Sequence, residues 1–192
     1  MTVELVVIGG SWGGFDALCA LLSPLPAHSE VPFVVALHRS AKTQDGTLEH
    51  MLADCVGLEV VTVEDKTPLR PGCVHLAPAD YHLLIEDGSL ALSTDALVQY
   101  SRPSIDVLFD SAAEEYAAGV VGILLTGANS DGAAGISRIK LRGGLTMAQD
   151  PASATKSAMP QAAIDTGHVD WVGPVPMLAR RLATLIGVEV TR

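Results

Sequence analysis

The chain has 192 residues, of which 48% are hydrophobic and 18% charged, and this favours a single domain over residues 1–192 rather than two domains. The formal net charge of -10 argues against nucleic acid and anionic membrane as general partners, because the field of the whole molecule repels both. The apolar runs are shorter than the ~18 residues of a membrane span, and residues 1–8 lack the basic residues of a signal peptide. These features predict a cytoplasmic protein without membrane insertion.

The three cysteines are Cys19, Cys55 and Cys73. Their number is odd, they are widely spaced, and each lies among apolar residues. The sequence therefore predicts neither a disulfide framework nor a Cys-x-x-Cys metal site. A reducing compartment is the expectation that follows.

Short apolar runs alternate with segments of helical spacing along most of the chain. Apolar residues recur at i, i+3, i+4 and i+7 over residues 15–22 and again over residues 48–55. Seven apolar runs are predicted strands: residues 3–8, 33–37, 58–63, 73–77, 120–125, 145–148 and 169–172. The alternation predicts an α/β fold with a doubly wound, mostly parallel sheet of roughly seven strands and helices on both faces.

One stretch between the fourth and fifth runs departs from this alternation. Residues 82–86 and 90–93 flank Asp87-Gly88, a dipeptide that tolerates positive φ, so we expect one antiparallel hairpin there. Pro103 is then predicted to open a helix, because the N–H groups of a first turn have no helical partners in any case. The predicted apolar face of this helix is Ile105, Leu108, Phe109 and Ala112.

The first apolar run leads into Gly9-Gly10-Ser11-Trp12-Gly13, which satisfies G-x-S-x-G, the pattern of a sharp turn that exposes a serine hydroxyl. A dinucleotide-binding fingerprint would need glycine at Ser11, and a P-loop would need lysine followed by serine or threonine at Phe15-Asp16, so neither motif is present. The alternative is a plain turn whose serine caps the helix. Ser11 is the candidate nucleophile.

His38 is the favoured general base among the six histidines. It directly follows the run at residues 33–37 and so reaches the carboxyl edge of a parallel sheet, where Ser11 must also lie and where ligands bind. His82, at the predicted hairpin, remains a rival. The other histidines fall in or near predicted helices, inside a strand or at the opposite edge: His28, His50, His75 and His168.

Asp131 follows the run at residues 120–125 and is the predicted carboxylate that orients the base and stabilises its imidazolium form. Asp150 competes, but Asp150-Pro151 is typical of a helix N-cap followed by a first-turn proline. Asp131 is itself a potential cap, although Asn129 and Ser130 are equally able to cap. The chain order Ser, His, Asp differs from the Ser, Asp, His order of the α/β-hydrolases.

Together these segments resemble the catalytic domain of the CheB family, the chemotaxis protein-glutamate methylesterases. Residues 8–14 are similar to the family's strand followed by Gly-Ala-Ser-Thr-Gly-Gly, residues 34–38 to its strand ending in histidine, and residues 125–133 to Leu-Thr-Gly-Met-Gly-x-Asp-Gly-Ala. The resemblance assigns nucleophile, base and orienting carboxylate to Ser11, His38 and Asp131. Further similar stretches are residues 69–72, 76–78, 102–109, 148–150 and 159–163.

The resemblance implies hydrolysis of γ-glutamyl methyl esters, with deamidation of certain receptor glutamines as a second activity. It implies a methylated chemoreceptor or related signalling protein as partner and no metal or organic cofactor, while the oligomeric state stays undefined. The family's usual receiver domain has no room before Met1, so we expect no regulation in cis by phosphorylation. The alternatives are a catalytically weak receptor-binding module of the same fold and a hydrolase of other esters.

Several positions near the predicted site depart from the family pattern. Trp12 stands where the family usually has threonine, Ala128 where it has methionine, and Arg39-Ser40 where Met-Pro is common. We expect backbone N–H groups near Trp12 and Ala128 to form the oxyanion hole, since those groups do not depend on the side chain. The Trp12 indole is expected to wall the ester pocket or to pack over the adjacent loop, and the small Ala128, which gives it space, makes the two substitutions a candidate compensating pair. The alternative is an exposed Trp12 with no bearing on the site.

Overall fold

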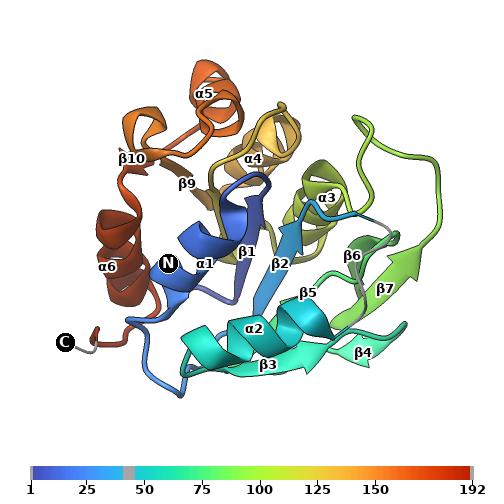
Figure 1. The fold of residues 1–192 in the computed structure, drawn as a ribbon. Helices are drawn as coiled ribbons and strands as arrows, with labels where there is room; N and C mark the ends of the chain where they lie inside the picture. The colour runs from blue at the N-terminus through green and yellow to red at the C-terminus, as the bar shows by residue number, and fades with distance from the viewer. Residues whose placement is uncertain (1, 41–45, 191–192) are drawn as a thin grey trace.

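The computed structural model describes residues 2–40 and 46–190 (Figure 1). Its strands are β1 (Leu5–Gly10), β2 (Phe33–Leu37), β3 (Glu59–Thr62), β4 (Thr67–Pro68), β5 (Cys73–Leu76), β6 (His82–Glu86), β7 (Ser89–Ser93), β8 (Val120–Leu124), β9 (Leu145–Gln149) and β10 (Trp171–Gly173). Its α-helices are α1 (Gly14–Leu22), α2 (Thr47–Cys55), α3 (Ile105–Tyr116), α4 (Ala133–Leu141), α5 (Ala158–Asp165) and α6 (Val175–Leu185). Two short 3₁₀ helices in the described residues are η1 (Ala117–Gly119) and η2 (Pro151–Ser153). None of the helices in the described residues is long and apolar enough to cross a membrane.

The main sheet has seven strands in the order β10-β9-β8-β1-β2-β5-β3, and each neighbouring pair is parallel. The predicted α/β sheet is therefore confirmed. After β1 the chain builds β2, β3 and β5 on one side of it, then returns to build β8, β9 and β10 on the other. The loops after β1 and β8 thus flank the switch point of the sheet, where open α/β folds bind ligands beyond the carboxyl ends of their strands.

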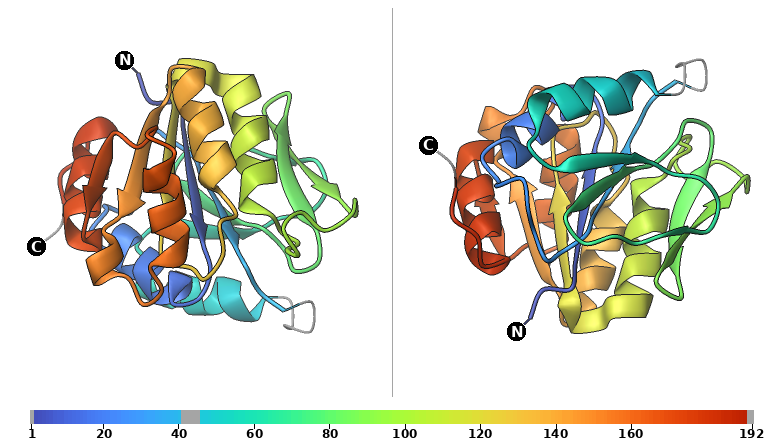
Figure 2. Two further views of the ribbon diagram at one scale, coloured as in Figure 1. Left: turned by 90° about the horizontal axis from the view of Figure 1, so that it is seen from above. Right: turned by 90° about the horizontal axis from the view of Figure 1, so that it is seen from below.

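Helices cover both faces of this sheet, as predicted (Figure 2). Successive side chains of a strand point to opposite faces, so Val6 and Ile8 of β1 pack with α1, α2 and α6, while Leu5 and Val7 pack with α3, α4, α5 and the β6–β7 hairpin. All four are 0% exposed, and burying one such side chain stabilises the fold by roughly 1.5–3 kcal/mol. The two cores hold β1 rigidly, and its last residue immediately precedes Ser11.

The predicted hairpin is present as β6 and β7, and β4 extends it to a three-stranded antiparallel sheet. β4 was not predicted, because two residues ending in a proline give no strand signal. The predicted place of Pro103 inside the first turn of α3 is also corrected. Ser104 is the N-cap, and its hydroxyl accepts a hydrogen bond from the Val107 N–H, so Pro103 lies just before the helix.

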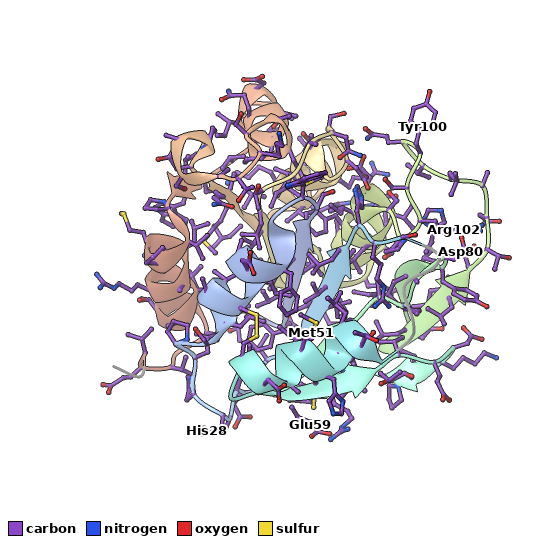
Figure 3. All side chains as sticks on the ribbon, in the orientation of Figure 1. His28, Met51, Glu59, Asp80, Tyr100 and Arg102 are labelled. Atoms are coloured by element: carbon purple, nitrogen blue, oxygen red, sulfur yellow. A yellow bond between two sulfur atoms is a disulfide. The ribbon has the colours of Figure 1, made fainter. Side chains whose placement is uncertain are left out.

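The expectation that the chain contains no disulfide is wrong for one pair of cysteines. Cys19 on α1 is bonded to Cys55 at the end of α2, with 5.7 Å between their Cα atoms (Figure 3). The two residues are 36 apart in the sequence, and only the packing of the apolar faces of the two helices brings them together. Cys73 is a buried free thiol in β5. The cysteines therefore no longer support a reducing compartment.

Candidate active site

Ser11 occupies a tight turn between β1 and α1. Its N–H donates to the Thr126 carbonyl at 2.9 Å, and its own carbonyl accepts from the Gly14 N–H at 2.7 Å. Gly13 has φ of 77°, and a Cβ there would lie 2.6 Å from the Thr155 hydroxyl, so only glycine fits this position. The backbone alone shapes the turn. In the described part of the chain, the Ser11 hydroxyl has no hydrogen-bond partner.

His38 lies beside Ser11 at the carboxyl edge of the sheet. The ladder between β1 and β2 pairs Gly10 with Leu37, and the His38 N–H continues it by donating to the Gly10 carbonyl at 3.0 Å. Neighbouring strands are about 4.8 Å apart, so the next residues of the two strands adjoin one another. The His38 side chain is 13% exposed, and its Nε2 lies 2.7 Å from Asp131 Oδ2. The structure therefore pairs His38 with Asp131.

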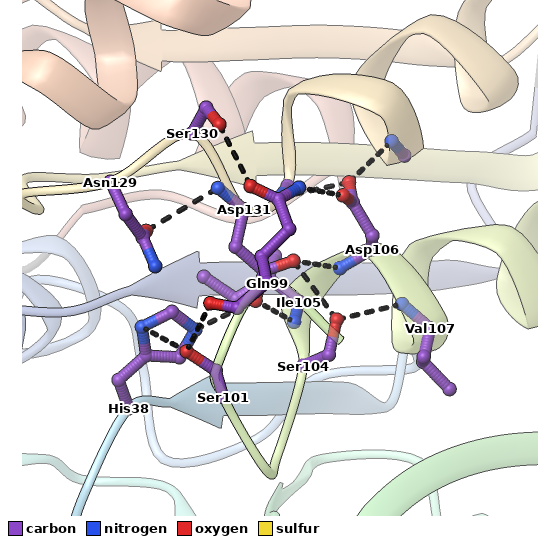
Figure 4. A network of polar contacts seen from close by, with 12 residues as sticks. His38, Gln99, Ser101, Ser104, Ile105, Asp106, Val107, Asn129, Ser130 and Asp131 are labelled. Atoms are coloured by element: carbon purple, nitrogen blue, oxygen red, sulfur yellow. Dashed lines mark hydrogen bonds and ion pairs between the residues drawn. The ribbon is translucent and has the colours of Figure 1, made fainter. Parts of the chain in front are cut away.

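The Asp131 carboxylate is fully buried and accepts four hydrogen bonds (Figure 4). Besides His38, the donors are the Ser104 hydroxyl at 2.9 Å and the N–H groups of Ile105 at 2.8 Å and Asp106 at 3.0 Å. These N–H groups open α3, so the carboxylate lies at the positive end of a helix dipole. Burial raises the pKa of Asp131, but the hydrogen bonds from His38, Asp106 and Ile105 outweigh it and hold the pKa below its ordinary value.

An ionised Asp131 determines the tautomer of His38. A carboxylate only accepts hydrogen bonds, so Nε2 carries the proton and Nδ1 keeps its lone pair. Nδ1 is 3.4 Å from the Ser101 hydroxyl, which is therefore the donor in that contact. Ser101 is not among the residues predicted from the sequence, although it comes directly before the family-like stretch 102–109. Its contact with His38 arises only from the folding of the loop that follows β7.

Asp106, on α3, is also held at a helix N-terminus. Its Oδ1 accepts from the N–H groups of Gly132 at 2.9 Å and Gly135 at 2.8 Å, at the start of α4, and its Oδ2 accepts from Gln99 Nε2 at 2.8 Å. α3 and α4 therefore exchange carboxylates, because Asp131 precedes α4 and caps α3. Burial and the charge of Asp131 raise the pKa of Asp106 against the hydrogen bonds from Gly135, Gly132 and Gln99.

The N-terminus of α4 is not capped by the side chain of Asp131, Asn129 or Ser130. Its N-cap is Gly132, and no side chain of the N-cap residue bonds the helix. Asn129 Oδ1 accepts from the Asp131 N–H at 3.3 Å, and the Ser130 hydroxyl donates to Gln99 Oε1 at 2.7 Å. The alternative that Asp131 only caps the helix following it is therefore wrong, since its carboxylate serves α3 and His38.

Both rival residues have structural partners. His82 is 1% exposed, its Nδ1 accepts from the Ser104 N–H at 3.1 Å, and its Nε2 lies 3.1 Å from the Ala96 carbonyl, so neither ring nitrogen is free. Asp150 is the N-cap of η2 and accepts from the Ala152 N–H at 2.9 Å, as its Asp-Pro sequence predicted. Among the residues that the structure describes, no group of three His, Cys, Asp or Glu residues is arranged to hold a metal ion.

Trp12 is 66% exposed, and Lys156 Nζ of the adjacent loop lies 5.7 Å from its ring centroid. The indole is therefore not buried over that loop. Thr126 ties the two loops together, because its hydroxyl contacts the carbonyls of Trp12 at 2.9 Å and Lys156 at 3.1 Å and accepts from the Lys156 N–H at 2.8 Å. Ala128 is exposed. Within residues 2–40 and 46–190, neither the Trp12 nor the Ala128 N–H donates a hydrogen bond.

Arg39 adds a buried ion pair next to His38. Its guanidinium donates to Glu49 Oε1 of α2 at 3.1 Å and to the Ala77 carbonyl, after β5, at 2.7 Å. The two side chains are 6% and 9% exposed. The departure from methionine at this position therefore links the end of β2, which carries His38, to a helix and to the next strand.

Comparisons of the sequence and of the structure with known proteins all point to the same family. The family model for CheB methylesterase matches residues 6–182. A relative from Leptospira interrogans is 42% identical over 173 residues, which cover 90% of this chain and 89% of that protein. A protein-glutamate methylesterase/protein-glutamine glutaminase of Anaeromyxobacter dehalogenans is 42% identical over 95% of this chain and 53% of its own length. The crystal structure of the Thermotoga maritima CheB methylesterase catalytic domain superposes with a TM-score of 0.90, at 30% identity over 97% of this chain and 100% of that one. The chain therefore belongs to the CheB methylesterase family.

Proposed function

We propose that this protein is a serine hydrolase of glutamyl methyl esters on chemoreceptor-type proteins, with Ser11 as nucleophile, His38 as general base and Asp131 as the orienting carboxylate. The observation that carries the proposal is the 2.7 Å contact between His38 Nε2 and the buried Asp131, at the strand edge that also bears Ser11. This contact leaves Nδ1 as the one ring atom able to accept a proton beside a G-x-S-x-G turn. The names of the similar proteins support the reaction type.

In the first half-reaction, His38 Nδ1 removes the Ser11 hydroxyl proton while Oγ attacks the ester carbonyl carbon, and an oxyanion forms. The imidazolium gives that proton to the methoxy oxygen, so methanol leaves and an acyl-enzyme remains. In the second, His38 takes a proton from water, the hydroxide attacks the acyl carbon, and Ser11 regains its hydroxyl as glutamate departs. A glutamine side chain would follow the same steps with ammonia as the leaving group.

Two sets of fixed groups support these steps. Asp131 keeps its negative charge because the N-terminus of α3 and its hydrogen bonds stabilise it, and that charge stabilises the imidazolium. The N–H groups of Trp12 and Ala128 are the proposed oxyanion hole, on loops joined through Thr126. Losing one such donor typically lowers the rate by about 10²- to 10³-fold.

In this proposal, the serine hydroxyl that pairs with His38 Nδ1 changes during the reaction. Nδ1 faces Ser101 in the structure, and catalytic hydrogen bonds often form only once substrate is bound. Ser11 would then replace Ser101 as the hydroxyl that donates to Nδ1. We further propose that residues 1–192 act as one catalytic domain in the cytoplasm, with methylated chemoreceptors or related signalling proteins as partners.

The test is methanol release from a purified, methylated chemoreceptor fragment, run beside labelling of the protein with a serine-directed fluorophosphonate. We expect methanol release and a single label on Ser11, and both should be lost in His38→Gln, because the unassisted hydroxyl is a weak nucleophile. Methanol release with a label on another serine would contradict the assignment of Ser11.

The absence of a Ser11–His38 hydrogen bond in the described structure favours one second candidate, a catalytically weak module that only binds a receptor. Such a module would bind the methylated fragment but release no methanol and take no fluorophosphonate label. A hydrolase of other esters would take the label and turn over small esters, yet leave the receptor methylated. The same pair of assays separates all three functions.

A further inference from the structure

A hollow of about 450 Å³ opens directly beside His38. Its lining includes Asp80, Leu97, Tyr100, Ser101 and Arg102 as well as His38 itself. His38 thus belongs both to the hollow and to the candidate active site, so the two adjoin. A polypeptide that presents a glutamyl side chain to Ser11 must pass close to this hollow, because one side chain spans only a short distance.

The turn at residues 98–101 forms one side of the hollow and has an unusual backbone. Val98 and Ser101 exchange two backbone hydrogen bonds, of 3.2 and 2.9 Å, and enclose Gln99 with φ of 46° and Tyr100 with φ of 63°. Two consecutive left-handed residues are normal for such a turn, but asparagine and glycine usually occupy them. A glutamine and a tyrosine adopt this conformation at a steric cost, and strained backbone of this kind is concentrated at functional sites.

Side chains hold the turn in place from both ends. Gln99 donates to Asp106 at 2.8 Å and accepts from Ser130 at 2.7 Å, and the Ser101 hydroxyl contacts His38 Nδ1 (Figure 4). Arg102 donates to Asp80 at 2.7 Å and, through Nη1, to the carbonyls at the start of the loop, those of Thr94 and Asp95. The loop is therefore anchored to α3, to the Asp131 loop and to the base.

This anchoring leaves Tyr100 projecting into solvent. Tyr100 lies at the tip of the loop (Figure 3) and is 97% exposed. Leu97, on the same loop, is 56% exposed. Packing within the protein does not explain Tyr100 or Leu97 at these positions, because both residues are largely exposed. Tyrosine is among the residues that contribute most when they become buried at a protein interface. The cations of the rim add little free charge, because Arg102 and Arg39 are engaged with Asp80 and Glu49.

We propose that Leu97, the turn at residues 98–101 and the hollow beside His38 form the docking surface for the polypeptide segment that carries the esterified glutamyl residue. This inference rests on the proposed function and adds the substrate class, a protein segment with apolar side chains next to the reacting glutamyl group. Tyr100 and Leu97 pack on those apolar side chains. Apolar contact is the favoured mode of recognition, because the turn exposes Tyr100 and Leu97 while the two arginines of the hollow are paired with carboxylates.

The test compares a protein substrate with a small one. Tyr100→Ala and Leu97→Ser should each lower kcat/KM for methanol release from the methylated receptor fragment by about tenfold, mainly through KM. Hydrolysis of p-nitrophenyl acetate should change by less than about twofold, because this ester is too small to reach the turn. Leu141→Ser is the matched control, because Leu141 is 71% exposed at the far end of α4 and does not line the hollow.

A binding measurement separates docking from chemistry. In a Ser11→Ala background, Tyr100→Ala should raise the Kd for the methylated fragment about tenfold, while Leu141→Ser should leave it unchanged. Equal losses on both esters, or an unchanged Kd, would overturn the docking surface even in an active enzyme. Binding that depends on Tyr100 in a protein whose wild type releases no methanol would instead overturn the proposed function and retain the docking surface.

Discussion

The two ends of the proposed catalytic array are built in different ways. Asp131 is fully buried, and its carboxylate accepts bonds from a hydroxyl, two helical N–H groups and the base. Ser11 is partly exposed on a turn shaped by backbone hydrogen bonds, and its hydroxyl bonds no group in the described residues. The carboxylate therefore has a structural task as well as a chemical one, whereas the hydroxyl has no structural task. Substitutions at the two ends should separate stability from activity.

The largest expected effect is on activity, at the Ser11 end. Ser11→Ala should lower kcat for ester hydrolysis by about 10⁴-fold or more, because no acyl-enzyme can form. The free energy of unfolding should change by less than about 0.5 kcal/mol, since only an unbonded hydroxyl is removed. Methanol release and urea denaturation measure the two quantities.

Ser101→Ala is the matched control, because it removes the other hydroxyl near His38. Its kcat should stay within about tenfold of wild type, since Ser101 forms no covalent intermediate in the proposed mechanism. If Ser101→Ala abolished turnover and Ser11→Ala did not, the nucleophile would be Ser101 and not Ser11.

The next largest effect is expected at the Asp131 end, on both kcat and the free energy of unfolding. Asp131→Asn should lower kcat by about 10³- to 10⁴-fold, because the amide no longer fixes the tautomer of His38 or stabilises its charged form. It should also cost about 1–3 kcal/mol of stability at neutral pH, because buried donors lose an ionic acceptor. Asp150→Asn, at a plain helix cap, should cost about 1 kcal/mol or less and leave kcat unchanged.

The pH dependence of this stability loss has a definite sign. The pKa of Asp131 is lowered in the folded protein, so its ionised form contributes stability at pH values above the ordinary carboxyl pKa. That contribution disappears as the pH falls through the lowered folded-state value. The difference in unfolding free energy between wild type and Asp131→Asn should therefore be largest near neutral pH and shrink in acid. A difference that grew on acidification would show that the folded protein does not favour the charged form.

Asp106 should give a smaller effect of the same kind, since it acts through Asp131. Its carboxylate holds the two N–H groups that open α4, and its own N–H bonds Asp131. In Asp106→Asn, an amide replaces the carboxylate that accepts from Gln99 Nε2, and an N–H group of that amide would face another donor. We therefore expect the loop that carries Asp131 to become less well held and kcat to fall about tenfold. Asp110→Asn is the control on the same helix, where an exposed ion pair with Arg138 is worth little. Equal effects of the two variants on kcat would show that Asp106 does not position Asp131.

These differences also explain what the sequence predicted and what it did not. Ser11, His38 and Asp131 each follow a strongly apolar run, so the rule that parallel strands end at one edge was enough to predict that all three lie at the same edge of the sheet. Ser101, Asp106 and the Cys19–Cys55 bond depend on how separate segments pack against one another, and no local periodicity or turn signal encodes that packing. The exchange of carboxylates between α3 and α4 could not be predicted for the same reason. Asp106 lies in α3 but caps α4, and Asp131 precedes α4 but caps α3.

The smallest effect concerns Trp12, where the family usually has threonine. The similarity to the family predicted that the indole and Ala128 are a compensating pair, but the structure gives the indole Lys156 as a neighbour. An exposed cation–π contact is worth about 0.5–1 kcal/mol. A double-mutant cycle of Trp12→Thr and Lys156→Ala should therefore give a coupling energy of about that size in the free energy of unfolding. The cycle of Trp12→Thr with Ala128→Met should give less, and kcat for a small ester should change less than about tenfold, because the Trp12 N–H is kept. Stronger coupling to Ala128 than to Lys156 would mean that the indole packs on Ala128 rather than beside Lys156 in the folded protein.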